Sequence, residues 1–196
     1  MPKYAGLRAS AWLLGLAPLA WTGFRFSTDA LGANPIEAVL LWSGRSALIL
    51  LLAGLAITPI RRFTGWNQII KVRRTVGLFA FFYVTLHFLI YLGLDQGFAW
   101  SFIVEDVVAR PFITSGFLGF LLLIPLAVTS TKGWIRRLGR RWQKLHRIVY
   151  PAAGLGVLHF YWKVKADTFW PLVALTILLV LLLARSPWRI LKRASG

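Results

Sequence analysis

Long apolar runs separated by short polar connections dominate this sequence. Each run has about the 17–25 residues that a helix needs to cross the hydrocarbon core of a bilayer, and none shows the period-two alternation of a half-buried strand. The pattern therefore predicts an all-α integral membrane protein, a bundle of six transmembrane helices. The predicted spans cover residues 9–26, 42–58, 75–94, 112–129, 145–162 and 168–184.

The first run, residues 9–26, has a second interpretation as a secretory signal peptide, because Lys3 and Arg8 precede it. Its length, and the lack of a small-residue cleavage site before a polar segment, favour an uncleaved first span instead. The chain is therefore predicted to form a single transmembrane domain over residues 1–196.

Charged residues divide unevenly between two sets of connections. Those predicted on one side of the membrane, including residues 61–74 and 132–144, hold most of the 23 Lys and Arg and none of the six Asp and Glu. Because an excess of Lys and Arg marks the cytoplasmic side, both chain termini are predicted to be cytoplasmic. The formal charge of +17 then reflects membrane orientation, and we do not expect nucleic-acid binding.

The composition narrows the candidate chemistry to three histidines. With 58% hydrophobic residues and a mean hydropathy of +0.67, the chain is too apolar for a soluble domain. It has no cysteine, and its single methionine is Met1, so disulfides, iron–sulfur clusters and thiolate ligands are excluded. The candidate ligands are His87, His146 and His159.

Two of these histidines are predicted to lie at the same depth. Counted along its span from the cytoplasmic end at about 1.5 Å per residue, His87 lies roughly 20 Å deep and His159 roughly 22 Å deep. They sit on the third and fifth spans, in the outer half of the membrane. His146 lies near the cytoplasmic surface, and an ideal helix turns about 220° between it and His159, so these two do not share a face unless Pro151 bends the helix.

Two imidazoles at one depth on different helices can supply both axial ligands of a b-type haem. We therefore predict His87 and His159 as metal ligands, with the haem between the third and fifth helices. The alternative for each is a buried imidazole hydrogen-bonded to a neighbouring carbonyl, and for His146 it is a solvated residue at the membrane surface. Three histidines cannot supply two ligands to each of two haems.

Arginines near the spans are candidates for binding anionic groups of a cofactor. Arg45 lies near the predicted depth of the haem, where it can pair with a propionate or extend to the interface. A second haem would need a fourth histidine, expected 13 or 14 residues before His87. Arg74 and Arg73 occupy those positions. A guanidinium does not ligate iron, but it can pair with a propionate or with an oxygen of a flavin or quinone.

Four stretches of the chain also carry a family pattern. They are similar to the MsrQ (YedZ) family of haem-binding membrane subunits, within the ferric-reductase-like transmembrane superfamily. The most specific motifs are RPFITSG at 110–116 and LGRRWQKLHRIVY at 138–150, and the others are GRSALILLLAGLAITPIRR at 44–62 and RTVGLFAFFYVTLHFLIYLG at 74–93. His87, His146 and His159 match the family's histidine positions.

The resemblance implies a multi-pass protein of the bacterial inner membrane that binds haem b, with FMN as an optional second cofactor. It implies electron transfer from the quinone pool, or from a cytosolic flavin reductase, to MsrP. MsrP is a periplasmic molybdopterin enzyme that reduces methionine sulfoxide in oxidised proteins. The chain is then an electron-transfer subunit with no substrate chemistry of its own.

Three other functions remain as alternatives. A ferric-reductase-like cytochrome with another acceptor normally needs a nicotinamide- and flavin-binding domain, and only a short tail follows the last span. A transporter should carry acidic or polar groups within its spans, whereas all six acids lie in the predicted outer connections. A haem-free membrane scaffold differs from a cytochrome in its absorption spectrum.

Overall fold

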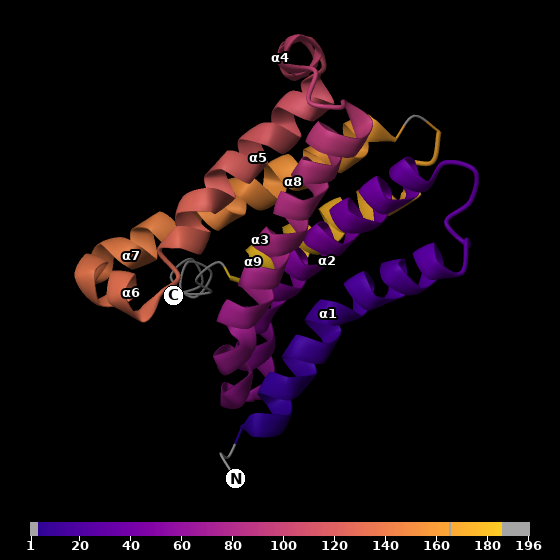
Figure 1. Cartoon of the computed structure of the whole chain (residues 1–196). Coiled ribbons are helices and arrows are strands. Elements are labelled where there is room, and N and C mark those ends of the chain that lie inside the picture. Colours follow the sequence, from indigo (N-terminus) through magenta and orange to yellow (C-terminus); the bar gives the residue numbers. More distant parts are fainter. Residues whose placement is uncertain (1–3, 165, 186–196) are drawn as a thin grey trace.

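The computed structural model describes residues 4–164 and 166–185, and every regular element in these residues is helical (Figure 1). The predicted all-α fold is therefore confirmed for this part of the chain. Lys3, Lys165 and the basic tail over 186–196, which entered the prediction of orientation, lie outside the described residues.

The long helices follow the predicted apolar runs, with shorter helical segments between them. The long ones are α1 (Ala5–Ser27), α2 (Pro35–Thr64), α3 (Arg73–Ile90), α5 (Pro111–Val128), α8 (Val149–Lys163) and α9 (Phe169–Leu183). The connecting segments are η1 (Asn67–Val72), the π-helical turn η2 (Tyr91–Asp95), α4 (Trp100–Ala109), α6 (Lys132–Leu138), α7 (Arg140–Leu145) and the 3₁₀ turn η3 (His146–Ile148).

Four helices form the centre of the molecule. Helix α2 packs along α3, and α5 packs along α8, while α3 also touches α5 and α2 touches α8. Ala152 and Ala153 of α8 are almost completely buried, at 1% and 0% exposure, because these small side chains let neighbouring helices approach closely. Helix α1 lies outside α2 and α3, and α9 packs against α8 and α2 (Figure 1).

The outer surface of the bundle is apolar, as a protein surrounded by lipid requires. Ile49, in the middle of α2, is 65% exposed, and Leu13 of α1 is 69% exposed. Within the described residues, three helical stretches are long and apolar enough to cross a membrane: Pro35–Thr64, Asn67–Asp95 and Pro111–Val128. Phe169–Leu183 is a shorter apolar helix. The count of six spans stays a prediction.

The structure adds local detail to two predicted segments. The acidic connection after the third span contains the ten-residue helix α4, which lies at the end of α5 opposite α6 and α7 (Figure 1). The fifth span is not one continuous α-helix, because the 3₁₀ turn η3 stands between α7 and α8. The break falls at His146 itself, and Pro151 lies in the first turn of α8.

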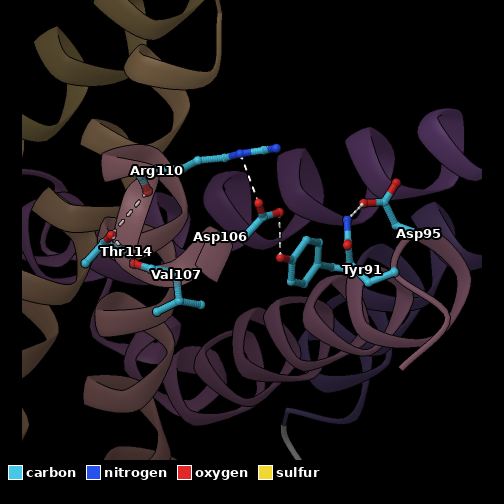
Figure 2. Close-up of polar contacts among 7 residues, drawn as sticks. Tyr91, Asp95, Asp106, Val107, Arg110 and Thr114 are labelled. Atoms are coloured by element: carbon cyan, nitrogen blue, oxygen red, sulfur yellow. Dashed lines mark hydrogen bonds and ion pairs between the residues drawn. The ribbon is translucent and has the colours of Figure 1, made fainter. Parts of the chain in front are cut away.

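A network around Asp106 anchors α4 to the end of α3 (Figure 2). The hydroxyl of Tyr91 donates to one carboxylate oxygen of Asp106 over 3.2 Å, and Nε of Arg110 lies 3.0 Å from the other. The hydroxyl of Thr114 donates to the carbonyls of Val107 and Arg110. Asp106 is only 8% exposed, and both its oxygens have partners, as a buried carboxylate requires.

Side chains from elsewhere in the bundle bond to the backbone of two helices that contain an internal proline. Pro59 has no N–H, so the carbonyl of Leu55 lacks its usual partner in α2, and Nη2 of Arg185 donates to that carbonyl. In α1, which contains Pro18, the hydroxyl of Tyr83 stands between two turns. It accepts from the N–H of Leu19 over 3.1 Å and donates to the carbonyl of Gly15 over 2.7 Å.

Candidate functional site

His87 of α3 and His159 of α8 meet in the centre of the bundle. Their ring centroids are 6.0 Å apart, and the ring planes cross at 80°. Both side chains are partly buried. The structure therefore brings together the two histidines that were predicted to share a depth.

Each of these rings uses its Nδ1 in the same way. Nδ1 of His87 lies 2.9 Å from the carbonyl oxygen of Leu40, and Nδ1 of His159 lies 2.7 Å from that of Phe112. A carbonyl can only accept, so Nδ1 carries the proton in both neutral rings, and Nε2 keeps its lone pair. A hydrogen bond to a neighbouring carbonyl was the alternative to a ligand role for each histidine. Because these bonds use Nδ1, they leave both Nε2 atoms available as ligands.

The two histidine contacts repeat the same local arrangement on two helices. In both cases the carbonyl lies 47 residues before the histidine. Three residues after each carbonyl is a serine whose hydroxyl donates to it over 2.9 Å, Ser43 to Leu40 and Ser115 to Phe112. The next residue in each helix is a glycine, Gly44 in α2 and Gly116 in α5.

Both glycines are needed for the histidine rings to approach the neighbouring helix. A Cβ added at Gly116 would lie 2.7 Å from Nδ1 of His159, and one added at Gly44 would lie 3.0 Å from Cε1 of His87. Contacts this short force a shift of the ring or of the helix. At Gly119, one turn further along α5, the nearest atom would be 3.5 Å away, which is ordinary van der Waals contact.

The 6.0 Å between the two ring centroids is close to the separation expected for two imidazoles that ligate one metal ion. A bond from a metal to an imidazole nitrogen is about 2 Å long, so two such bonds separate the ring centroids by roughly 6 Å. Ligating histidines usually donate their second ring N–H to a carbonyl or carboxylate, which orients the ring and raises its basicity. Two axial imidazoles suit haem iron, because the macrocycle supplies the remaining ligands.

His146 lies apart from this pair, in η3. Its Nε2 is 3.0 Å from the hydroxyl of Thr129, and its ring stacks on Trp142 with centroids 3.9 Å apart. The Thr129 hydroxyl donates to the carbonyl of Pro125 over 2.6 Å, so it accepts from His146. This ring bridges the ends of α5 and α7, and it is partly buried.

The two predicted arginines occupy different parts of the structure. Arg45 is exposed on α2, directly after Gly44, and within the described residues it has no hydrogen-bonding or ionic partner. Arg74 is exposed in the first turn of α3, at the opposite end of that helix from His87. The structure does not bring Arg74 to the histidine pair.

Two basic residues beside the histidine pair were missed as candidates. Lys163 lies four residues after His159 and interacts electrostatically with both histidines. Its Nζ is 5.9 Å from the ring centroid of Phe112. Together with Arg110 and Trp162, these residues line a pocket at the N-terminal end of α5 and the C-terminal end of α8. The sequence did contain a signal, since residues four apart share a helix face.

Comparison with known proteins identifies relatives of this chain. Residues 43–157 match the family described as ferric reductase like transmembrane component. A protein of Rhodospirillum rubrum named protein-methionine-sulfoxide reductase heme-binding subunit MsrQ is 53% identical over 96% of this chain and 91% of its own length. The chain belongs to the MsrQ family. A protein of the same name from Caulobacter vibrioides is 50% identical over 91% of this chain and 84% of its own length. Another, from Herminiimonas arsenicoxydans, is 46% identical over 100% of this chain and 91% of its own length.

The matched ferric-reductase-like region begins at Ser43 and ends at Val157, two residues before His159. It includes both Ser-Gly pairs and His87, while the MsrQ matches cover nearly the whole chain. No solved structure matches the chain significantly. Membership of MsrQ thus rests on sequence, and the histidine arrangement rests on the structure described above.

Proposed function

We propose that this chain is a haem b-binding electron-transfer subunit of a methionine sulfoxide reductase system, with His87 and His159 as the axial ligands. The observation that carries the proposal is the pairing of the two rings at 6.0 Å, each with Nδ1 committed to a carbonyl. The names of the MsrQ relatives support it, since each is called a heme-binding subunit. When bound, the haem would supply one-electron redox chemistry.

The protein's own residues have three tasks in this proposal. Leu40 and Phe112 fix the tautomer and orientation of the histidines through their carbonyls, and each hydrogen bond makes the ligating nitrogen more basic. Gly44 and Gly116 leave space for the rings beside the neighbouring helices. The apolar surroundings keep water from the pair and so favour a stable ligand geometry over exchange with solvent.

Basic residues at the outer ends of the helices are the proposed partners of the propionates. Lys163 and Arg110 line the pocket near the histidine pair, and Arg45 follows the glycine that faces His87. Each would form charge-assisted hydrogen bonds with a carboxylate. This places the anionic edge of the cofactor toward the face that we assign to the periplasm.

The proposed partners follow from this orientation. We place the chain in the bacterial inner membrane as a single domain over residues 1–196, with six spans and both termini in the cytoplasm. The acceptor is the periplasmic molybdopterin enzyme MsrP, which repairs oxidised proteins. The donor is the quinone pool or a cytosolic flavin reductase, with FMN as an optional cofactor on the cytoplasmic side, near Arg74 and His146.

The absorption spectrum of the purified protein tests the ligand assignment. His87→Ala and His159→Ala should each abolish a low-spin bis-imidazole haem spectrum, because one axial ligand is lost. His146→Ala is the matched control and should leave most of the spectrum intact, since its ring bonds to Thr129 instead. Loss of the haem in His146→Ala but not in His87→Ala would show that the pairing is wrong. A wild-type protein without a haem band would favour a membrane scaffold.

A further inference from the structure

Arg73 and Arg185 are far apart along the chain, but their charges interact in the folded structure. Arg73 begins α3, and Arg185 lies two residues after the end of α9. The two guanidinium groups interact electrostatically with one another, and Arg73 also interacts with Tyr150 and His146. Both arginines are partly buried. Like charges held together in this way raise the energy of the site unless an anion compensates them.

No carboxylate of this chain supplies that compensation within the described residues. The one ion pair recorded there joins Asp106 to Arg110, near the other end of the bundle. The six acidic residues all lie in connections that we assign to the opposite side of the membrane: Asp29, Glu37, Asp95, Glu105, Asp106 and Asp167.

Arg185 has a structural role, but that role uses only some of the hydrogen-bond donors of its side chain. Its Nη2 donates to the Leu55 carbonyl that Pro59 leaves without a helical partner, and its Nη1 donates to the hydroxyl of Tyr150 over 2.7 Å. Both acceptors are neutral. Its Nε is buried and, among residues 4–164 and 166–185, has no hydrogen-bond partner. A buried donor on a charged group is unfavourable when it has no acceptor.

A second unpartnered donor lies one turn away. The hydroxyl of Thr58 is buried and has no hydrogen-bond partner in the part of the chain that the structure describes. Thr58 follows Leu55 by three residues, so the two lie on the same face of α2. The hydroxyl of Tyr150 accepts from Arg185, which leaves its own hydrogen free to be donated. The cluster therefore offers several donors and two positive charges without an acidic acceptor.

We propose that Arg73, Arg185, Tyr150 and Thr58 form a binding site for a phosphate group. A phosphate oxyanion has enough acceptor oxygens to take donors from several helices at once, and guanidinium groups bind it with charge-assisted hydrogen bonds. Two sources share this chemistry, the headgroup of an anionic phospholipid and the phosphate of a soluble ligand. The site is separate from the histidine pair and does not depend on which residues hold the haem.

Ligand-induced stabilisation of the full-length protein tests the proposal. The protein is held in a neutral detergent with phosphatidylcholine, and its unfolding midpoint is measured while either phosphatidylglycerol or inorganic phosphate is added. A ligand that binds the folded state raises this midpoint in a saturable manner. We expect Arg73→Gln and Arg185→Gln to weaken the apparent affinity about tenfold or more, because each removes a charge-assisted hydrogen bond. Arg62→Gln, an exposed control with the same charge change, should respond as the wild type does.

Thr58→Val separates a binding role from a structural one. The Thr58 hydroxyl makes no hydrogen bond to another described residue in the ligand-free protein. Its replacement by a methyl group of similar shape should therefore leave the stability of the ligand-free protein unchanged or raise it. Our proposal adds that the same change weakens the response to the ligand. A response to phosphatidylglycerol alone identifies a lipid, and a response to inorganic phosphate alone identifies a soluble ligand. A response to neither, or one unchanged in all three variants, would overturn the proposal.

Discussion

The glycine opposite each histidine allows the ring to approach its neighbouring helix closely. Gly116 has the least space, since an added Cβ would lie 2.7 Å from Nδ1 of His159. That nitrogen also makes the 2.7 Å contact with the Phe112 carbonyl. A methyl group at this position therefore displaces both the ring and its hydrogen bond.

Alanine substitutions along α5 and α2 provide a graded test of this packing. Gly116→Ala should reduce haem content most, and Gly44→Ala should reduce it less, because its Cβ would lie 3.0 Å from His87. Gly119→Ala should retain the wild-type content, since the nearest atom to its Cβ is 3.5 Å away. The ratio of haem absorbance to protein absorbance measures the series. Equal loss in all three variants would indicate general helix destabilisation instead.

Sequence reasoning reached the histidine pair by counting rises along two helices, and it missed the groups that orient the rings. The depth of His87 and His159 depends only on helix geometry and the positive-inside rule. The roles of Gly44 and Gly116 depend on which helices touch, and no local pattern reveals that. The repeated Ser-Gly pair is visible in the sequence. That each pair stands the same number of residues before its histidine becomes informative only when the contacts of Leu40 and Phe112 with the histidines are known.

Helix α1 is held to α3 by a side chain that enters its backbone ladder. Hydropathy predicts the boundaries of the helices to within several residues. It does not predict that Tyr83 bonds to the backbone of α1, because that contact depends on how closely α3 approaches α1. Helix α1 contains Pro18, and the hydroxyl of Tyr83 occupies the place of the hydrogen bond from Leu19 to Gly15. Tyr83 is only 2% exposed.

Tyr83→Phe should therefore destabilise the protein. It removes one hydroxyl but leaves a backbone donor and a backbone acceptor unsatisfied, at a cost of about 1–3 kcal/mol for each group. In a Pro18→Ala background the helix can close its own bond, so the same change should cost less. Thermal unfolding of the two single variants and the double variant measures this coupling. Strictly additive effects would contradict the inserted position of the hydroxyl.

At the scale of the whole molecule, the distribution of charge predicts orientation. Reporter fusions after Arg62 and Arg137 should report the cytoplasm, and fusions after Asp95 and Lys165 should report the periplasm. The physical reason is that Lys and Arg near span ends remain on the cytoplasmic side. Paired reporters that are active on opposite sides make the measurement internally controlled. The reverse pattern would move the histidine pair to the inner half of the membrane, away from a periplasmic acceptor.

The repeated carbonyl, serine, glycine and histidine arrangement divides the molecule into two related halves. One half carries α2 and α3, the other carries α5 and α8, and each contributes a single imidazole to a shared centre. Such a site resembles the interface of a symmetric dimer, in which neither copy is complete. We expect the chain to tolerate being divided in the connection before α4, with haem absorbance recovered only when both fragments are produced together. Either half on its own would hold only one of the two imidazoles.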